Sequence, residues 1–216
     1  MSTKNTSVSV VPEEVTLATG EQVEHIMDMW RRRIKGRKLT LDEANQIIRN
    51  GGQYLPTMDK AADVLVDQVR SDMQNTIIRM VRNIQRTRTA VQAIDATGRT
   101  KYVDSEVLAT MPVGQGPEEV ELTYFKLSRF ASPKEVAAEF ESRNMDPDPQ
   151  AQAADNEQHP AFADEHPNGT QWNLDGNTSS FLTFLRWNDK RSVNCYRNVS
   201  HWHGNWWFAG VRKISK

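Results

Sequence analysis

Residues 57–96, TMDKAADVLVDQVRSDMQNTIIRMVRNIQRTRTAVQAIDA, contain neither proline nor glycine and decide how the fold is interpreted. Thr57 followed by Asp59 is typical of a helix start, and Gly98 marks a stop. The stretch predicts one helix of about 40 residues, which at 1.5 Å per residue is about 60 Å long.

Apolar residues recur along this stretch at spacings that alternate between four and three, with one extra step of four between Met73 and Ile77. This pattern predicts a coiled coil with a single stutter. The predicted helix is too long for its short neighbours to cover, so we expect a homo-oligomer. The alternative is a break at the stutter, with the helix folding back as a hairpin inside one bundle. The self-association residues are Val66, Val69, Met73, Ile77, Met80, Ile84, Val91 and Ile94.

Before this stretch, the sequence predicts a disordered arm over 1–18 and two short helices. Thr19 and Gln22 form a capping box for the first helix, which ends near Gly36. Thr40 and Glu43 do the same for the second. We therefore expect a helical domain over 19–97.

After the helical domain, glycines and prolines over 98–117 predict a hinge. Residues 118–216 then read as a small α+β domain with an antiparallel sheet and one helix. Residues 120–127 alternate like a strand, Ser132 and Pro133 begin a helix, and three strand-like runs end the chain. A long acidic, proline-rich connector separates the helix from those runs. The predicted fold class is thus α+β in two parts.

Charge is nearly balanced, with 27 basic and 28 acidic residues, so net charge gives no reason to invoke nucleic acid. The only cysteine is Cys195, which rules out an internal disulfide and suits a reducing compartment. No signal-peptide core and no apolar run of about 18 residues is visible. We expect a soluble, cytoplasmic protein with no membrane partner.

The motifs HPNGTQW, FLRW and WWFAGVRK lie within roughly the last 90 residues. In this combination the segment resembles a C-terminal module of uncharacterised bacterial and phage-type proteins. The resemblance brings no known function to this chain and does not extend to the N-terminal half. A module of this kind joined to an unrelated helical half implies an interaction unit.

Three residues are weak candidates for chemistry. His201 and His203 are two positions apart, a spacing that chelates metal from a strand, and Cys195 lies across a possible hairpin from them. Gly204 beside the histidines favours a solvated turn, and a lone cysteine in a strand is usually a small core residue. We expect no cofactor, no metal and no catalytic residue.

Aromatic residues give a stronger signal, because five of the six tryptophans fall in the last 45 residues. Trp206 and Trp207 point to opposite faces of a strand, so at most one of them can be a core residue. Exposed aromatic residues beside arginine are typical of protein-binding hot spots and of base-stacking platforms. The predicted macromolecule-binding residues are Trp187, Trp202, Trp206, Trp207, Arg186, Arg197, Arg212 and Lys213.

Two basic clusters keep a nucleic-acid partner open, because such runs neutralise phosphates. Solvated helix faces explain them equally well. The residues are Arg31, Arg32, Arg33, Lys35, Arg37 and Lys38 in the first cluster, and Arg79, Arg82, Arg86 and Arg88 in the second.

The sequence therefore favours a non-enzymatic interaction protein with a protein partner. The resemblance implies an accessory protein of a phage or mobile element that binds and modulates a host or defence complex. A nucleic-acid-binding protein is the first alternative, and a small metal- or cysteine-dependent enzyme is the second.

Overall fold

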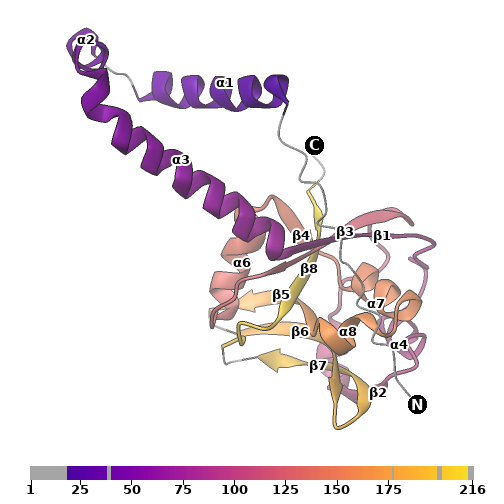
Figure 1. Cartoon of the computed structure of the whole chain (residues 1–216). Coiled ribbons are helices and arrows are strands. Elements are labelled where there is room, and N and C mark those ends of the chain that lie inside the picture. The colour runs from indigo at the N-terminus through magenta and orange to yellow at the C-terminus, as the bar shows by residue number, and fades with distance from the viewer. Residues whose placement is uncertain (1–18, 38–39, 177, 199–200, 214–216) are drawn as a thin grey trace, which may run out of the picture. The chain divides into compact units, whose positions relative to one another are not determined.

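A computed structural model describes residues 19–37, 40–176, 178–198 and 201–213. The chain divides into two compact units, Met1–Val64 and Leu65–Lys216. The predicted arm over 1–18 lies outside the described residues. Helices dominate the first unit and a sheet the second, so the two-part α+β prediction is confirmed at this coarse level (Figure 1).

The N-terminal region consists of α1 (Gly20–Gly36), α2 (Leu41–Arg49) and α3 (Gly51–Gln74). The side chain of Thr19 accepts from the Gln22 N–H, and that of Thr40 accepts from the Glu43 N–H, so both predicted capping boxes are present. α2 ends at Arg49, and Gly51 and Gly52 are the first residues of α3. None of the three helices contains a buried residue.

The predicted helix over 57–96 is wrong beyond Gln74. There α3 ends, and β1 (Thr76–Val81) follows after a single residue. The β-branched residues Thr76, Ile77 and Ile78 favour a strand, and β1 pairs antiparallel with β3 along its whole length. Asn83 then adopts a left-handed backbone with φ 57°, which turns the chain before α4 (Ala90–Asp95).

This break also divides the predicted coiled-coil seam. Val66, Val69 and Met73 are exposed on α3, whereas Ile84 and Ile94 are buried in the sheet unit. Ile77 packs against the core from β1, Met80 is exposed on the same strand, and Val91 is exposed on α4. A continuous seam from Val66 to Ile94 therefore does not exist.

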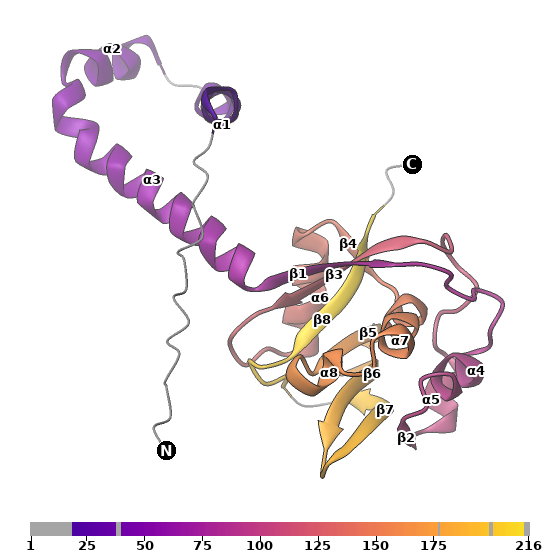
Figure 2. The same ribbon diagram turned by 45° about the vertical axis from the view of Figure 1, so that its right-hand side comes forward.

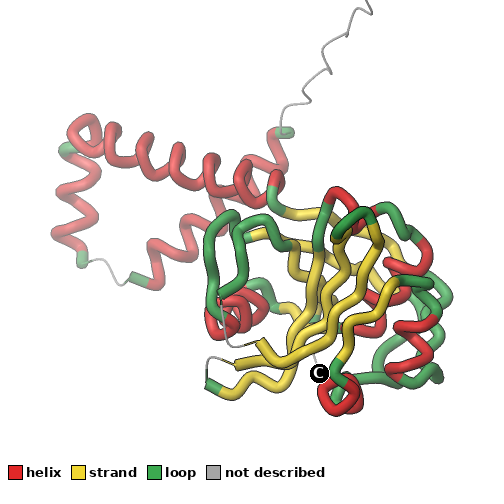
Figure 3. The backbone as a smooth tube through the Cα atoms, turned by 90° about the horizontal axis from the view of Figure 1, so that it is seen from below, coloured by secondary structure: helices red, strands yellow, loops and turns green. Residues whose placement is uncertain are grey.

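Eight described strands form one sheet in the order β1-β3-β8-β5-β6-β7-β2, with β4 paired to β8 (Figure 3). The sheet is larger than the small antiparallel sheet that we expected. Two of its pairings, β2 with β7 and β5 with β8, are parallel. The strands after β1 are β2 (Thr100–Val103), β3 (Val120–Lys126), β4 (Met145–Pro147), β5 (Asn168–Asp175), β6 (Thr178–Trp187), β7 (Lys190–Asn198) and β8 (Trp207–Arg212).

Helices cover both faces of this sheet (Figure 2). On one face, α4, α5 (Ser105–Ala109), α7 (Pro149–Gln158) and α8 (Phe162–Glu165) enclose two apolar clusters. On the other face, α6 (Pro133–Ser142) packs over an aromatic cluster that includes Phe125, Phe140 and Phe208. As predicted, Ser132 caps α6 and Pro133 is its first residue.

Two segments that we expected to be solvent-exposed are structural. The predicted hinge over 98–117 contains β2 and α5, and it buries Val107, Leu108 and Met111. The predicted connector contains α7, of which eight of ten residues are buried. Because residues 76–117 supply two strands and two helices to the sheet unit, the expected boundary at residue 118 is corrected to one between Val64 and Leu65.

Candidate functional site

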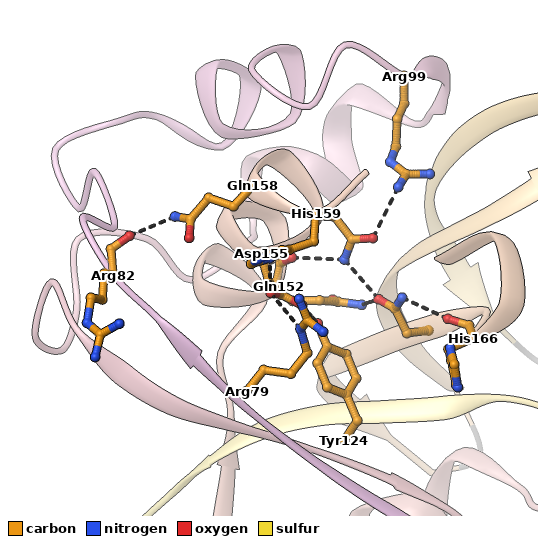
Figure 4. A network of polar contacts seen from close by, with 11 residues as sticks. Arg79, Arg82, Arg99, Tyr124, Gln152, Asp155, Gln158, His159 and His166 are labelled. Atoms are coloured by element: carbon orange, nitrogen blue, oxygen red, sulfur yellow. Dashed lines mark hydrogen bonds and ion pairs between the residues drawn. The ribbon is translucent and has the colours of Figure 1, made fainter. Parts of the chain in front are cut away.

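A buried polar network surrounds Asp155 on α7 (Figure 4). The fully buried carboxylate accepts hydrogen bonds from Arg79 Nε at 2.9 Å and from the Tyr124 hydroxyl at 2.7 Å. His159 Nδ1 lies 2.9 Å from the same carboxylate. Burial, and then the Asp155 charge, raise the pKa of Tyr124 well above its usual value, so its proton stays available for this bond.

A second part of the network joins side chains of α7, β5 and the segment before β2 to each other and to a backbone carbonyl. Asn168 Oδ1 accepts from Gln152 Nε2 at 2.7 Å and from Asn156 Nδ2 at 3.1 Å. Arg99 Nη2 donates to Asn156 Oδ1 at 3.3 Å and to the Pro160 carbonyl at 2.8 Å. Because Arg99 is buried, the pKa of its guanidinium falls to about 10.

Polar side-chain contacts also fix the N-terminal end of α7. Arg86 makes a bidentate ion pair with Asp148, at 2.9 and 2.8 Å. The Gln150 amide donates to three backbone carbonyls, those of Gln85, Arg86 and Arg88. These contacts attach α7 to the segment that follows β1. We therefore interpret the network as a structural device that fixes a polar helix against the sheet.

This arrangement explains the second basic cluster. Arg79, Arg86 and Arg88 each pair with a carboxylate of α7 or its cap, and Arg82 lies 3.3 Å from Glu119 at the surface. A phosphate would have to compete with these carboxylates, which weakens the nucleic-acid interpretation of this cluster. The first cluster lies on or next to α1, where its described members Arg31, Arg32, Arg33, Lys35 and Arg37 are exposed. Lys38 lies outside the described residues.

The three candidates for chemistry differ in burial. Cys195 is fully buried on β7, and burial raises the pKa of its thiol to about 12, so the thiolate is disfavoured. His201 and His203 are exposed, and the His203 ring lies 4.7 Å from that of Phe130. Within the described residues, no group of three or more His, Cys, Asp and Glu side chains is placed to hold a metal ion.

The four candidate tryptophans differ in exposure. Trp202 and Trp207 are buried, and Trp206 is partly buried against Trp202, with ring centroids 5.5 Å apart. Trp187, at the end of β6, is 60% exposed. Of the pair predicted to face opposite ways, Trp207 is thus the core residue.

The basic residues expected beside these tryptophans are separated. Arg186 lies 3.4 Å from Asp189 and 4.0 Å from Asp164, and Arg197 lies 4.0 Å from Asp175. Arg212 is exposed at the end of β8, and Lys213 pairs with Glu141 at 2.7 Å. The predicted binding residues therefore come from different ends of the sheet, and only Trp187 remains a well-exposed aromatic residue among them.

A groove of about 380 Å³ lies beside Trp187, on the outer strands β6, β7 and β2. Its aromatic walls are Trp187, Tyr102 and Tyr196, of which the tyrosines are 46% and 39% exposed. Every lining side chain is uncharged, and the full lining is Tyr102, Leu185, Trp187, Ser192, Asn194 and Tyr196. We call this surface the aromatic groove.

One polar atom in the aromatic groove is not satisfied. Asn194 Oδ1 is buried and has no hydrogen-bond partner within the described part of the chain. Asn194 lies on β7 between Ser192 and Tyr196, which line the groove from alternate positions of the strand. A buried acceptor that lacks a donor is energetically costly.

The groove also borders an open sheet edge, because β2 is the last strand of the sheet. The Asp104 N–H donates to the Cys195 carbonyl at 2.9 Å, which fixes the side of β2 that faces β7. Backbone groups alternate along a strand, so those of Lys101 and Val103 point away from β7. The edge is therefore able to pair with a further extended chain.

Sequence reasoning found Trp187 but missed the two tyrosines. Tyr196 directly follows Cys195 on β7, so its side chain points to the face opposite that of Val193 and Cys195. The sequence alone could therefore have predicted that Tyr196 lies outside the core. Tyr102 was hidden because its segment resembled a hinge. Its position depends on the parallel pairing of β2 with β7, which no local pattern indicates.

A second exposed apolar surface belongs to the N-terminal helices. Apolar side chains recur along α1, α2 and α3 and remain exposed, among them Ile26, Ile48 and Met58. Exposed apolar residues that gather in a contiguous patch mark interaction sites. None of the described helices is long and apolar enough to cross a membrane.

Comparisons with protein-family models, with curated proteins and with solved structures each gave no match to this chain.

Proposed function

We propose that this chain is a non-enzymatic interaction protein. Its aromatic groove docks an extended segment of a protein partner, and its N-terminal helices join copies of the chain. The resemblance of the C-terminal motifs to a bacterial and phage-type module supports an accessory role, in which the protein binds and modulates a host or defence complex.

The observation that carries this proposal is the aromatic groove itself. Three aromatic side chains from three strands converge there with large exposed fractions. Tyrosine and tryptophan supply large contact areas at low entropic cost, and they are enriched in binding hot spots. The uncharged lining favours a protein over a polyphosphate chain.

The open edge of β2 beside the groove supports binding of the partner segment in an extended form. An extended segment that pairs with the backbone of Lys101 and Val103 adds a strand to the sheet, which is an established mode of peptide recognition. Alternate side chains of that segment then face the aromatic groove.

The test is affinity capture from the cells that produce the protein, with three forms of the intact chain as bait. Trp187→Ala removes the most exposed wall of the groove, and Phe130→Ala removes a similarly exposed aromatic residue outside it. We expect at least one partner to be lost with Trp187→Ala and retained with Phe130→Ala. Identical partner lists for all three baits would refute groove docking.

A further inference from the structure

The charges of α1 are divided between its two halves. The first half carries Glu21, Glu24 and Asp28, and the second half carries Arg31, Arg32, Arg33 and Lys35. This order suits the helix dipole, because acids lie near the N-terminus and bases near the C-terminus. It also makes the surface of the helix self-complementary when a second helix runs in the opposite direction.

The same helix displays an apolar stripe that is largely exposed among the described residues, with only Trp30 half-buried. Val23, Met27, Trp30 and Ile34 follow one another at spacings of four, three and four, the repeat of a coiled-coil seam. Val23, Met27 and Ile34 are 47–48% exposed, and α1 contains no buried residue. An isolated helix of 17 residues is only marginally stable in water, so a partner on this stripe is needed to hold it.

From these two features we infer that α1 pairs antiparallel with α1 of a second copy of this chain, about a two-fold axis near Asp28 and Met29. The inference deepens the self-association part of the proposed function and rests on it. In this alignment Val23 lies across from Ile34 of the partner copy, and Met27 lies across from Trp30. A two-fold axis makes both halves of the interface identical and closes the assembly as a dimer.

Charge selects the antiparallel direction over the parallel one. Glu24 directly follows the seam residue Val23, and Arg31 directly follows the seam residue Trp30. Residues at this position of the repeat lie next to each other in an antiparallel pair of helices. Glu24 of each copy therefore lies near Arg31 of the other. A parallel pair in register would instead bring the basic halves of the two copies side by side, which is unfavourable.

The test is light scattering and sedimentation of the intact chain over a range of concentrations. We expect a dimer. Glu24→Arg turns both attractive contacts into repulsions and weakens the dimer about tenfold. Glu24→Arg combined with Arg31→Glu restores the attraction in the antiparallel pair, so we expect affinity within about threefold of the original. Both substitutions introduce good helix formers at exposed positions, so folding is preserved.

The control is Asp189→Arg, which makes the same charge change at an exposed turn of the sheet unit and leaves the dimer unchanged. A dimer that ignores Glu24→Arg, or one that the double variant does not restore, would overturn α1 pairing while self-association stands. A monomer at every concentration would overturn both. Groove docking is measured separately by the Trp187→Ala capture, so its failure is distinguishable from either result.

Discussion

The N-terminal helices and the sheet unit use their apolar residues in opposite ways. In α1, α2 and α3 the apolar side chains lie on regular stripes, and α1 and α2 begin with capping boxes, yet no residue of the three helices is buried. In the sheet unit three clusters fill both faces of the sheet, and even a helix without large apolar residues, α7, is buried. The difference shows that amphipathic periodicity identifies a helix without identifying what covers it.

This contrast has an energetic consequence. The sheet unit has its own core, so its stability is expected to be independent of association. The N-terminal helices gain little from burial within one chain, so their helix content depends on propensity, caps and a partner. Matched changes in the two regions therefore affect different observables: the free energy of unfolding in one, and helix content in the other.

The largest effect is expected for Asp155→Ala in the sheet unit. The substitution leaves Arg79 and Tyr124 without their buried partner, and the unfolding free energy falls by about 3–5 kcal/mol. Urea denaturation followed by tryptophan fluorescence measures the loss. Asp175→Ala removes an exposed pair at 4.0 Å and is expected to change stability by less than about 0.5 kcal/mol. Equal effects of the two changes would show that the network has no structural role.

Smaller effects on stability, of opposite sign, are expected when one glycine in each region is replaced by alanine. A Cβ at Gly210 on β8 would lie 2.6 Å from Phe140 Cε1 and 2.8 Å from the Asp146 carbonyl oxygen, so Gly210→Ala destabilises the chain by about 1–3 kcal/mol. A Cβ at Gly52 in α3 would meet nothing within 4 Å. Gly52→Ala therefore favours the helix by up to about 1 kcal/mol. Urea denaturation for Gly210→Ala and far-UV circular dichroism for Gly52→Ala check these signs, and a stabilising Gly210→Ala would contradict the packing described for β8.

The smallest effect concerns one capping box in each region. Glu135 at the start of α6 accepts bonds from the Ser132 N–H, the Ser132 hydroxyl and Arg129, which lower its pKa to about 2. Bonds to Thr40 lower the pKa of Glu43 on α2 in the same way. A lowered carboxyl pKa stabilises the folded state above the unfolded value of about 4.3, and this contribution is lost as the pH falls toward 2.

Glu135→Gln should therefore make unfolding less sensitive to pH between about 4 and 2, as measured by urea denaturation at several pH values. Glu43→Gln should instead change only the pH dependence of helix content, because α2 has no core to report a loss of stability. If both variants altered unfolding alike, the N-terminal helices would share the cooperative transition of the sheet unit.

Local chemistry predicted the local features of this fold. Thr19, Thr40 and Ser132 cap helices as expected, and the alternating runs at the C-terminus form β6, β7 and β8. The long helix failed because an absence of glycine and proline does not prevent a strand. At Thr76 the β-branched residues and pairing with β3 outweigh a continued helix.

The candidate site was less predictable, because its residues are assembled from distant segments. The sequence of α7, PQAQAADNEQ, has no apolar residue larger than alanine beyond its proline, so it resembles a solvated linker. Its burial depends on partners such as Arg79 and Asn168, which no local pattern connects to it. The aromatic groove likewise requires β2 beside β7, a pairing across about 90 residues of chain.

The order of strands in the sheet constrains how the protein is made. β1 and β2 emerge first during synthesis, yet they form the two opposite edges of the sheet and do not touch each other. β1 has no neighbour until β3 is translated, and β2 waits for β7, near the end of the chain. Pairings between such distant segments form slowly. The nascent chain therefore exposes β1 until β3 has been translated and exposes β2 until β7 has been translated, and a chaperone would protect these unpaired strands during those intervals.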